Sequence, residues 1–394
     1  MTAGMCKSIK KYISIQLSIF IFFVALSVGS CDLILDAAVR AAGGSPPKSW
    51  HVVGGVGFSG GKATYTSLAL DPSGTPFVAY MDEANGDKAT VMKYSSGSWQ
   101  LVGSAGFSAD RAHLISLAID TSGTPYVVYS DQANGYKATV KKYADGTWQT
   151  IGTAGFSAGD AYHFSLVLDP SGIPYVAYRD GANGDKATVM KYSSGSWQLV
   201  GSAGFSAGGA IYISLVLDLS GTPYISYGDD SNGYKATVKK YADGTWQTVG
   251  TAGFSAESAS YISLVLDPSA RPFVAYSDGH FGGKATVMQY SGGVWQPVGR
   301  TGFSADEAQW VSLALDVWGR VYVVYKDLAN SNKATVMMHV RAQDDGRGWQ
   351  PVGTPGFSNG RVEYTSLKLD SSGTPFVSFS DWAINGGATV MTFE

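Results

Sequence analysis

One stretch of about 49 residues is repeated seven times along this chain, and that repetition limits the fold more than any other feature. Each copy opens with a tryptophan, and successive tryptophans are 49 residues apart five times and 54 residues apart once. These residues are Trp50, Trp99, Trp148, Trp197, Trp246, Trp295 and Trp349. A period of this length is typical of architectures in which neighbouring units share one continuous core.

Each period contains four short runs of β-branched and aromatic residues, which we expect to be strands. One set of these runs is 165–169, 174–178, 186–192 and 197–201. Turn residues separate the runs, as in Asp169-Pro170-Ser171-Gly172, which suits a type I turn. Because the runs are largely apolar on both faces, each sheet should be covered on both sides.

The two ends of the repeated region are complementary. It begins at 50–54 with a run of the fourth type and stops after 388–393, a run of the third type. Pairing these runs completes a seventh unit and closes a ring, whereas an open array would expose two sheet edges to aggregation. The sequence therefore predicts an all-β fold, a seven-bladed β-propeller with four antiparallel strands per blade, over residues 50–394.

The repeat motifs GFSAG, SLxLDxSGTPYVAY and NGxKATVMKY resemble those of bacterial extracellular and lipoprotein β-propeller repeat proteins. The resemblance covers residues 50–394. It implies the propeller fold and carries no activity.

The first thirty residues have the pattern of a targeting segment. A lysine-containing start precedes an apolar stretch, 12–28, and the segment ends Val28-Gly29-Ser30-Cys31. That ending resembles the bacterial lipobox, which implies cleavage before Cys31 and its diacylation. The lipid alone would then hold the protein in the bacterial cell envelope, facing the periplasm or the surface. An ordinary signal peptide and an uncleaved anchor are the alternatives. Residues 31–49 would be a tether, since they end in a Gly- and Pro-rich linker.

Composition excludes several partners. The net charge is −3 and no basic run follows the targeting segment, so we expect no nucleic-acid binding. The cysteines are Cys6 and Cys31, which leaves no disulfide framework and no thiolate metal site. We expect a monomer without a cofactor.

Positions that are identical in every copy are interpreted as framework. The Phe of each Gly-Phe-Ser should plug the contact between blades, and the opening Trp should pack between outer strands. An Asp at the end of the second strand, such as Asp82, should form an Asx turn and an ion pair with the Lys that begins the third strand, such as Lys88. Calcium bound at Asp82, Asn85 and Asp87 is the alternative, although the full ligand set of a calcium loop is missing.

Positions that vary between copies are interpreted as the site. They precede the repeated Ser of the innermost strand and should surround the mouth of the central channel, together with loops that open on the same face. The candidate ligand-binding residues are Tyr65, His113, His163, Tyr212, Tyr261, Trp310, Tyr364, Tyr136, Tyr234 and Trp382. Aromatic rings beside polar groups suit a glycan or a protein, while a purely structural packing of the mouth is the alternative.

Catalytic motifs are absent from the sequence: it has no phosphate loop, no nucleophile elbow and no zinc-binding His pair. We therefore expect a non-catalytic module that recognises a glycan or an envelope protein. A scaffold subunit of an envelope complex is one alternative. A glycosidase or lyase is another, which would need paired carboxylates from the varied loops. The candidates for such a pair are Asp160, Glu257, Asp306, Glu307 and Glu363.

Overall fold

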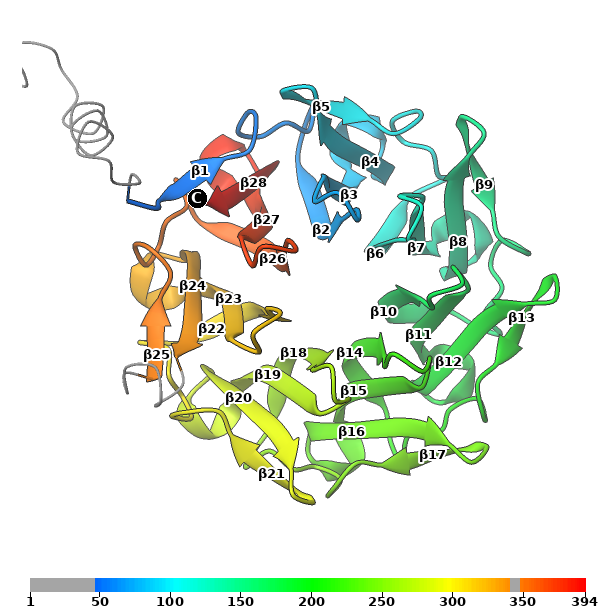
Figure 1. Ribbon diagram of the computed structural model, residues 1–394. Coiled ribbons are helices and arrows are strands. Elements are labelled where there is room, and N and C mark those ends of the chain that lie inside the picture. Colours follow the sequence, from blue (N-terminus) through cyan, green and yellow to red (C-terminus); the bar gives the residue numbers. More distant parts are fainter. Residues whose placement is uncertain (1–46, 341–347) are drawn as a thin grey trace, which may run out of the picture. The chain divides into compact units, whose positions relative to one another are not determined.

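The computed structural model describes residues 47–340 and 348–394, and seven small antiparallel sheets make up most of their regular secondary structure (Figure 1). Each sheet has four strands, and the sheets stand in a ring, so the predicted seven-bladed propeller is confirmed. The targeting segment, Cys31 and the tether up to residue 46 lie outside the described residues. Within the described residues, no helix is both long and apolar enough to cross a membrane.

The blades are numbered in chain order, and each one runs from an inner to an outer strand. Blades 1 and 2 are β2 (Ala63–Leu70), β3 (Pro76–Asp82), β4 (Lys88–Ser95) and β5 (Ser98–Leu101), then β6 (Ala112–Ile119), β7 (Pro125–Asp131), β8 (Lys137–Ala144) and β9 (Thr147–Thr150). Blades 3 and 4 are β10 (Ala161–Leu168), β11 (Pro174–Asp180), β12 (Lys186–Ser193) and β13 (Ser196–Leu199), then β14 (Ala210–Leu217), β15 (Pro223–Asp229), β16 (Lys235–Ala242) and β17 (Thr245–Thr248). Blades 5 and 6 are β18 (Ala259–Leu266), β19 (Pro272–Asp278), β20 (Lys284–Ser291) and β21 (Val294–Pro297), then β22 (Ala308–Leu315), β23 (Val321–Asp327), β24 (Lys333–Val340) and β25 (Gly348–Pro351). Blade 7 is β26 (Val362–Leu369), β27 (Pro375–Asp381), β28 (Gly387–Phe393) and β1 (Trp50–Val52).

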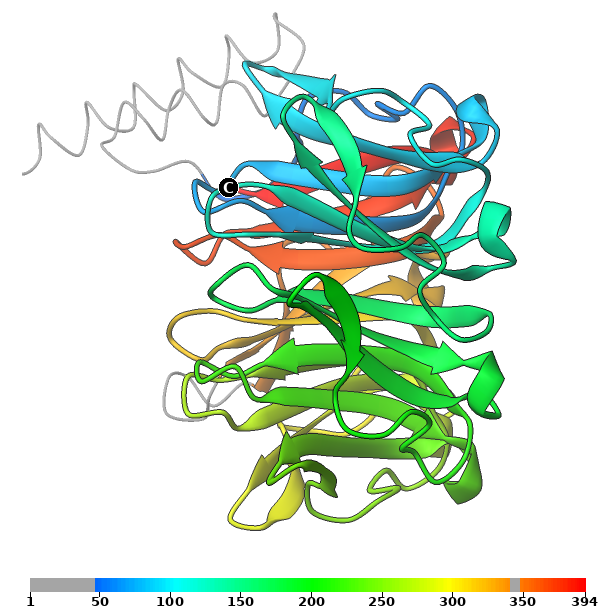
Figure 2. The ribbon, with the colours of Figure 1, turned by 90° about the vertical axis from the view of Figure 1, so that its right-hand side faces the viewer.

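A short 3-10 turn joins the second and third strands of every blade. These turns are η1 (Glu83–Asn85), η2 (Gln132–Asn134), η3 (Gly181–Asn183), η4 (Asp230–Asn232), η5 (Gly279–Phe281), η6 (Leu328–Asn330) and η7 (Trp382–Ile384). The coiled turns that Figure 2 shows lie on one side of the ring, which we call the varied face. The start of each inner strand lies beside them, as Ala63 lies opposite Asp82, so the predicted sharing of one face is confirmed.

The ring is closed by the two ends of the repeated region, as predicted. β1 pairs antiparallel with β28, and Trp50 lies opposite Phe393. Beyond the strand, the amide of Val53 donates to the carbonyl of Val390 at 2.9 Å, just as Val102 donates to Val91 within blade 1, where a turn connects the third and fourth strands. The closing junction therefore repeats the contacts of a covalent one.

The inner strands begin earlier than predicted. The sequence indicated residues 165–169, but β10 begins at Ala161, so the varied segment is the first part of the strand. The pairing with β11 shifts between Tyr162 and Ser165, which marks a β-bulge. A bulge breaks the alternation of side chains, which is why the pattern of apolar residues did not reveal this part of the strand.

A stacked aromatic pair fastens each outer strand to the segment that enters its blade. Trp148 lies on Phe107 with ring centroids 4.1 Å apart, and its Nε1 donates to the carbonyl of Val102 at 2.8 Å. All seven pairs stack in this way, at 3.9 to 4.3 Å. The predicted packing role of both rings is confirmed.

The aspartate at the end of the second strand has different partners from those predicted. Asp131 lies opposite Lys137 in the strand register, yet its carboxylate accepts from the Ala133 amide (3.1 Å), Asn134 Nδ2 (2.9 Å) and Thr139 Oγ1 (2.7 Å). Among the described residues no ion pair joins this aspartate to this lysine in any blade, so that half of the prediction is wrong. The carboxylate is buried, and a threonine and an asparagine satisfy it there without the cost of burying a second charge. The Asx turn itself is confirmed.

That threonine also connects the blades. Thr139 Oγ1 accepts from the amide of Gly155, which belongs to the segment entering blade 3, at 2.8 Å. The corresponding bond occurs at all seven junctions.

A hoop of serine hydroxyls surrounds the channel. The amide of Leu117 in β6 donates to Ser67 Oγ of β2 at 3.0 Å, and each blade repeats this bond to its predecessor at 2.9 to 3.3 Å. One backbone amide on the open edge of every inner strand is thereby satisfied. We call the aromatic stacks, the threonine links and the serine hoop together the frame.

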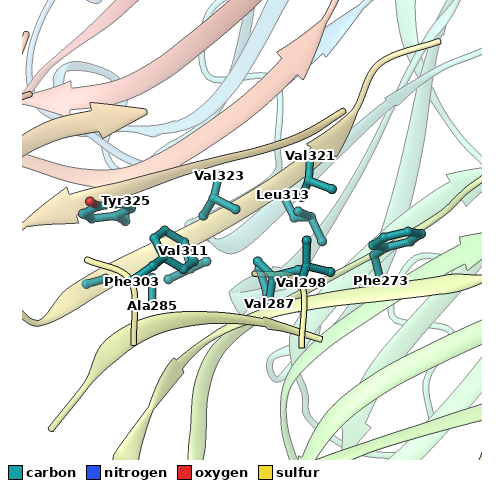
Figure 3. Packing of buried hydrophobic residues seen from close by; sticks show 12 residues of the cluster. Phe273, Ala285, Val287, Val298, Phe303, Val311, Leu313, Val321, Val323 and Tyr325 are labelled. Atoms are coloured by element: carbon teal, nitrogen blue, oxygen red, sulfur yellow. The ribbon is translucent and has the colours of Figure 1, made fainter. Parts of the chain in front are cut away.

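Apolar side chains fill the space between neighbouring blades. Between blades 5 and 6, Val287 and Val298 pack toward Leu313 and Val323 (Figure 3). Six comparable clusters lie at the other junctions. Stability is therefore spread around the ring, and the inner ends of the strands are left to build a site.

Candidate functional site

The bulge of each inner strand holds one residue in the left-handed region of backbone space. The seven residues are Tyr65 (φ 54°), Leu114 (54°), His163 (52°), Tyr212 (52°), Tyr261 (51°), Trp310 (53°) and Tyr364 (56°). A side chain in this conformation costs about 1 to 3 kcal/mol. The bulge is common to all blades, so the backbone fixes seven equivalent positions at which only the side chain differs.

These seven side chains line one cavity on the axis of the ring. Its volume is about 230 Å³, and the rest of its lining comes from the residue that follows each of them. We call this cavity and its seven residues the mouth. The prediction that these varied positions gather at the channel is confirmed.

Aromatic contacts run most of the way round the mouth. Starting from His163, the ring centroids are 5.5 Å from Tyr212, then 5.1 Å to Tyr261, 5.1 Å to Trp310, 4.3 Å to Tyr364 and 4.9 Å to Tyr65. Leu114 interrupts the series between Tyr65 and His163. The rings are tilted by 47° to 61°, so each presents part of its face to the cavity.

The mouth is electrically neutral at physiological pH. Burial raises the pKa of Tyr65, Tyr261 and Tyr364, so their hydroxyls stay protonated and can donate hydrogen bonds. Burial, with a smaller contribution from Arg179, lowers the pKa of His163 to about 4. The mouth thus offers apolar ring faces and neutral polar groups.

Four of the predicted site residues lie outside the mouth. His113, Tyr136, Tyr234 and Trp382 are on the varied face but do not line the axial cavity. His113 contacts Tyr136, with ring centroids 5.8 Å apart. Trp382 lies under two cations, Lys62 and Arg361, each 5.1 Å from its ring centroid. These residues form a rim around the mouth.

The predicted carboxylates are distributed around the varied face. Glu257 lies 3.7 Å from His280 Nδ1, Glu307 accepts from Gln309 Nε2 at 2.7 Å, and Glu363 pairs with Arg361. Glu307 and Glu363 approach one side of the mouth, since both act on Tyr261. Burial is the main cause of the raised pKa of Tyr261, and the charges of Tyr212, Glu307 and Glu363 raise it further.

The calcium site considered from the sequence, at Asp82, Asn85 and Asp87, has side chains that are already engaged with other partners. Asp82 Oδ2 already accepts from Asn85 Nδ2 and Thr90 Oγ1, each at 2.8 Å. Asp87 lies 3.4 Å from the Arg111 guanidinium. Within the described residues no group of three or more His, Cys, Asp or Glu side chains is placed to hold a metal ion.

A second cavity adjoins the mouth, and sequence reasoning missed it. It has a volume of about 380 Å³, lies at blade 5 on the varied face, and shares Tyr212 and Tyr261 with the mouth. Small residues form much of its lining, including Ser260 and Ser277. Two serines at paired positions, a combination that no other copy has, were the available signal, but it needs the strand register to become visible.

Comparison with known proteins gave no matching family model and no matching curated protein. The fold is similar to that of a variant of the Aleuria aurantia lectin in complex with Fucα1-6GlcNAc, at 16% identity and a TM-score of 0.50, covering 77% of this chain and 97% of the lectin. It is also similar to an ulvan lyase, a polysaccharide lyase bound to -[GlcA(1-4)Rha3S]-, at 12% identity and a TM-score of 0.55, covering 87% and 95%. A puromycin hydrolase complexed with PGG matches at 12% identity and a TM-score of 0.55, covering 84% of this chain and 54% of the hydrolase. At these identities the likeness shows the fold alone.

Proposed function

We propose that this protein is a non-catalytic recognition module that binds a glycan in the mouth on its varied face. The observation that carries the proposal is a single axial cavity of about 230 Å³ with six aromatic or imidazole rings and one leucine at seven equivalent backbone positions. Ring faces stack on the apolar faces of sugars, while protonated tyrosine hydroxyls supply directional hydrogen bonds.

The neutrality of the mouth favours an uncharged sugar over a charged peptide segment at this position. His163 is neutral above about pH 4, and the tyrosines keep their protons. Solved structures of similar fold include a lectin and a lyase in complex with sugars, which supports the proposal.

In the proposed setting, the lipid on Cys31 tethers the ring to the bacterial envelope and leaves the varied face free to meet glycans. Metabolic labelling with a radioactive fatty acid tests this part. We expect label in the wild-type protein and none after Cys31→Ser; label that survives the substitution would contradict it.

A glycan array tests the binding function. We expect the protein to bind neutral glycans on the array. We expect Tyr212→Ala and Tyr261→Ala each to weaken this binding about tenfold or more. A tenfold change corresponds to about 1.4 kcal/mol, and stacked rings contribute on this scale. Leu114→Ala is the matched control, since it alters the same bulge without removing a ring. Wild-type protein that retains no glycan would overturn the proposal, and specific co-purification of an envelope protein would then favour a scaffold.

A carbohydrate-active enzyme is the second candidate, because Glu307 and Glu363 approach the same side of the mouth from neighbouring blades. Glycosidases use two carboxyl groups about 5 to 10 Å apart. Incubation with a retained glycan and analysis of chain length separates the two candidates. Cleavage that disappears in Glu307→Gln and Glu363→Gln would establish the enzyme, and an unchanged glycan would support recognition alone.

A further inference from the structure

The second cavity, at blade 5, adjoins the mouth directly. We call it the blade-5 pocket, and the residues that matter for its chemistry are Tyr212, Ser260, Tyr261, Ser277, Gly283 and Glu307. Since Tyr212 and Tyr261 line both cavities, a ligand bound in the mouth can continue into the pocket without crossing a wall.

The pocket exists because blade 5 carries small side chains at two paired positions. Ser260 lies opposite Ser277 in the register of β18 and β19. The same pair is Tyr162 and Arg179 in blade 3. In blade 6 it is Gln309 and Lys326. Blade 5 is the copy in which both members of the pair are serine, so the pair has less side-chain volume there than in blades 3 and 6.

The absence of a side chain at Gly283 leaves room for the Glu307 carboxylate at the edge of the pocket. Gly283 has φ +81°, and a Cβ on it would lie 2.6 Å from Cγ of Glu307. Other blades carry a side chain at this position, such as Asp87 in blade 1 and Tyr136 in blade 2. Gly283 thus serves the approach of Glu307 from blade 6 as well as the backbone turn.

The polar groups of the pocket suit a hydroxyl-rich ligand. Ser277 Oγ donates to the carbonyl of Gly283 at 2.9 Å, so its lone pairs can accept from a ligand hydroxyl. Gln309 Nε2 holds one oxygen of Glu307 at 2.7 Å, and a carboxylate has about four acceptor positions in all. Tyr261 keeps its proton and can donate.

We infer that the blade-5 pocket is a second sugar subsite, which binds the neutral residue adjacent to the one in the mouth. Glu307 accepts hydrogen bonds from its hydroxyls and repels a uronate or sulfate group at this position. The inference rests on the proposed glycan binding and adds a minimum ligand, two linked sugar residues, together with a charge preference.

The experiment fills the pocket with side chains that the fold already accommodates. The double variant Ser260→Gln/Ser277→Lys installs the blade 6 pair in blade 5. The matched control, Thr64→Gln/Met81→Lys, installs the same pair in blade 1, which shares no residue with the pocket. Glu307→Gln is a second, smaller change that leaves the volume intact, and circular dichroism confirms that each variant is folded.

The probes are the methyl glycosides of glucose, galactose, mannose and fucose, and neutral oligosaccharides of two to four residues built from them, titrated by calorimetry. We expect at least one oligosaccharide to bind the wild-type protein tenfold or more tightly than its methyl glycoside. The filled variant should lose that advantage while its affinity for the methyl glycoside stays within twofold, and the blade 1 control should keep both. Glu307→Gln should reduce the advantage about tenfold and relax the discrimination against oligosaccharides that carry a uronate.

The outcomes separate the two proposals. If methyl glycosides bind and oligosaccharides bind no better, or if the filled variant and Glu307→Gln both keep the full advantage, the second subsite is wrong and recognition in the mouth stands. If no probe binds the wild-type protein, glycan recognition itself fails and the subsite falls with it.

Discussion

The frame and the mouth are built from the same seven repeats, yet they use repetition in opposite ways. In the frame, every blade makes the same contacts with the same side chains, as Trp148 does with Phe107. In the mouth, an identical backbone bulge carries different side chains, such as His163 and Trp310. The comparison teaches that residues common to all copies close the ring, while those that differ give the ring one distinctive site. Substitutions in the two regions should therefore differ in their effect on the free energy of unfolding.

The largest loss of stability should follow removal of a frame tryptophan. Trp148→Ala removes the stack on Phe107 and the bond to Val102, and we expect a loss of about 3 to 5 kcal/mol in the free energy of unfolding. Trp318→Ala is the control, because Trp318 is 62% exposed on a turn, and it should change stability by about 0.5 kcal/mol or less. Urea denaturation measures both. Equal losses would contradict the distinction.

One mouth residue should contribute to stability in a pH-dependent way. Burial lowers the pKa of His163 to about 4 in the folded protein, whereas a histidine in the unfolded chain has its ordinary pKa of 6.5. The unfolded chain therefore takes up a proton first as the pH falls. The stability that neutral His163 provides is complete above pH 6.5 and is lost between pH 6.5 and about 4. At 1.36 kcal/mol per pKa unit, the loss at pH 4.5 is roughly 2 to 3 kcal/mol.

Urea denaturation of the wild-type protein and of His163→Gln at pH 7.5 and 4.5 measures this effect. Carboxyl groups titrate in both proteins, so the difference between their pH dependences isolates His163 and the influence of Arg179 beside it. Identical pH dependences would show that His163 titrates normally.

Two equivalent aspartates should respond differently to the same change. Asp131 has three hydrogen-bond donors, whereas Asp381 Oδ2 has no partner in the closing blade, where Ile384 replaces the usual asparagine. Burial raises the pKa of Asp381, which reflects a carboxylate that is poorly compensated. We expect Asp131→Asn to cost about 1 to 3 kcal/mol and Asp381→Asn to be close to neutral at pH 7. Thermal unfolding compares them, and a larger loss for Asp381→Asn would refute the difference.

The smallest effect on stability should come from the mouth itself. Tyr261→Gly loses ring contacts worth about 0.5 to 1.5 kcal/mol but relieves a left-handed conformation that costs about 1 to 3 kcal/mol. We expect a net change within about 1 kcal/mol, together with loss of glycan binding. Thermal unfolding and the array measure the two properties, and a loss of stability like that of Trp148→Ala would make Tyr261 part of the frame.

The sequence predicted the fold almost completely, because its repeats carry redundant information. The ring closure followed from the strand types at 50–54 and 388–393, and it is observed between β1 and β28. The partner of each buried aspartate was predicted wrongly, since Lys137 and Thr139 both lie near Asp131 in the chain and only burial decides between them.

The site was predicted in part. The seven positions of the mouth were found from their variation, but the bulge that directs them to the axis was not, since no apolar pattern marks it. The blade-5 pocket escaped because it depends on Ser260 and Ser277, which become neighbours only through the register of β18 and β19. A cavity is defined by side chains that are missing, and a single sequence does not show which absences coincide in space.

The closing junction has a consequence for how the chain could be rearranged. Trp50 lies opposite Phe393, and the bonds across that junction match those at the covalent ones. A short hairpin could therefore connect these two strands while the chain is cut at another outer turn, such as Asp145-Gly146. Such a circular permutant should fold into the same ring with the same mouth, because the contacts between blades do not depend on which blade is synthesised first.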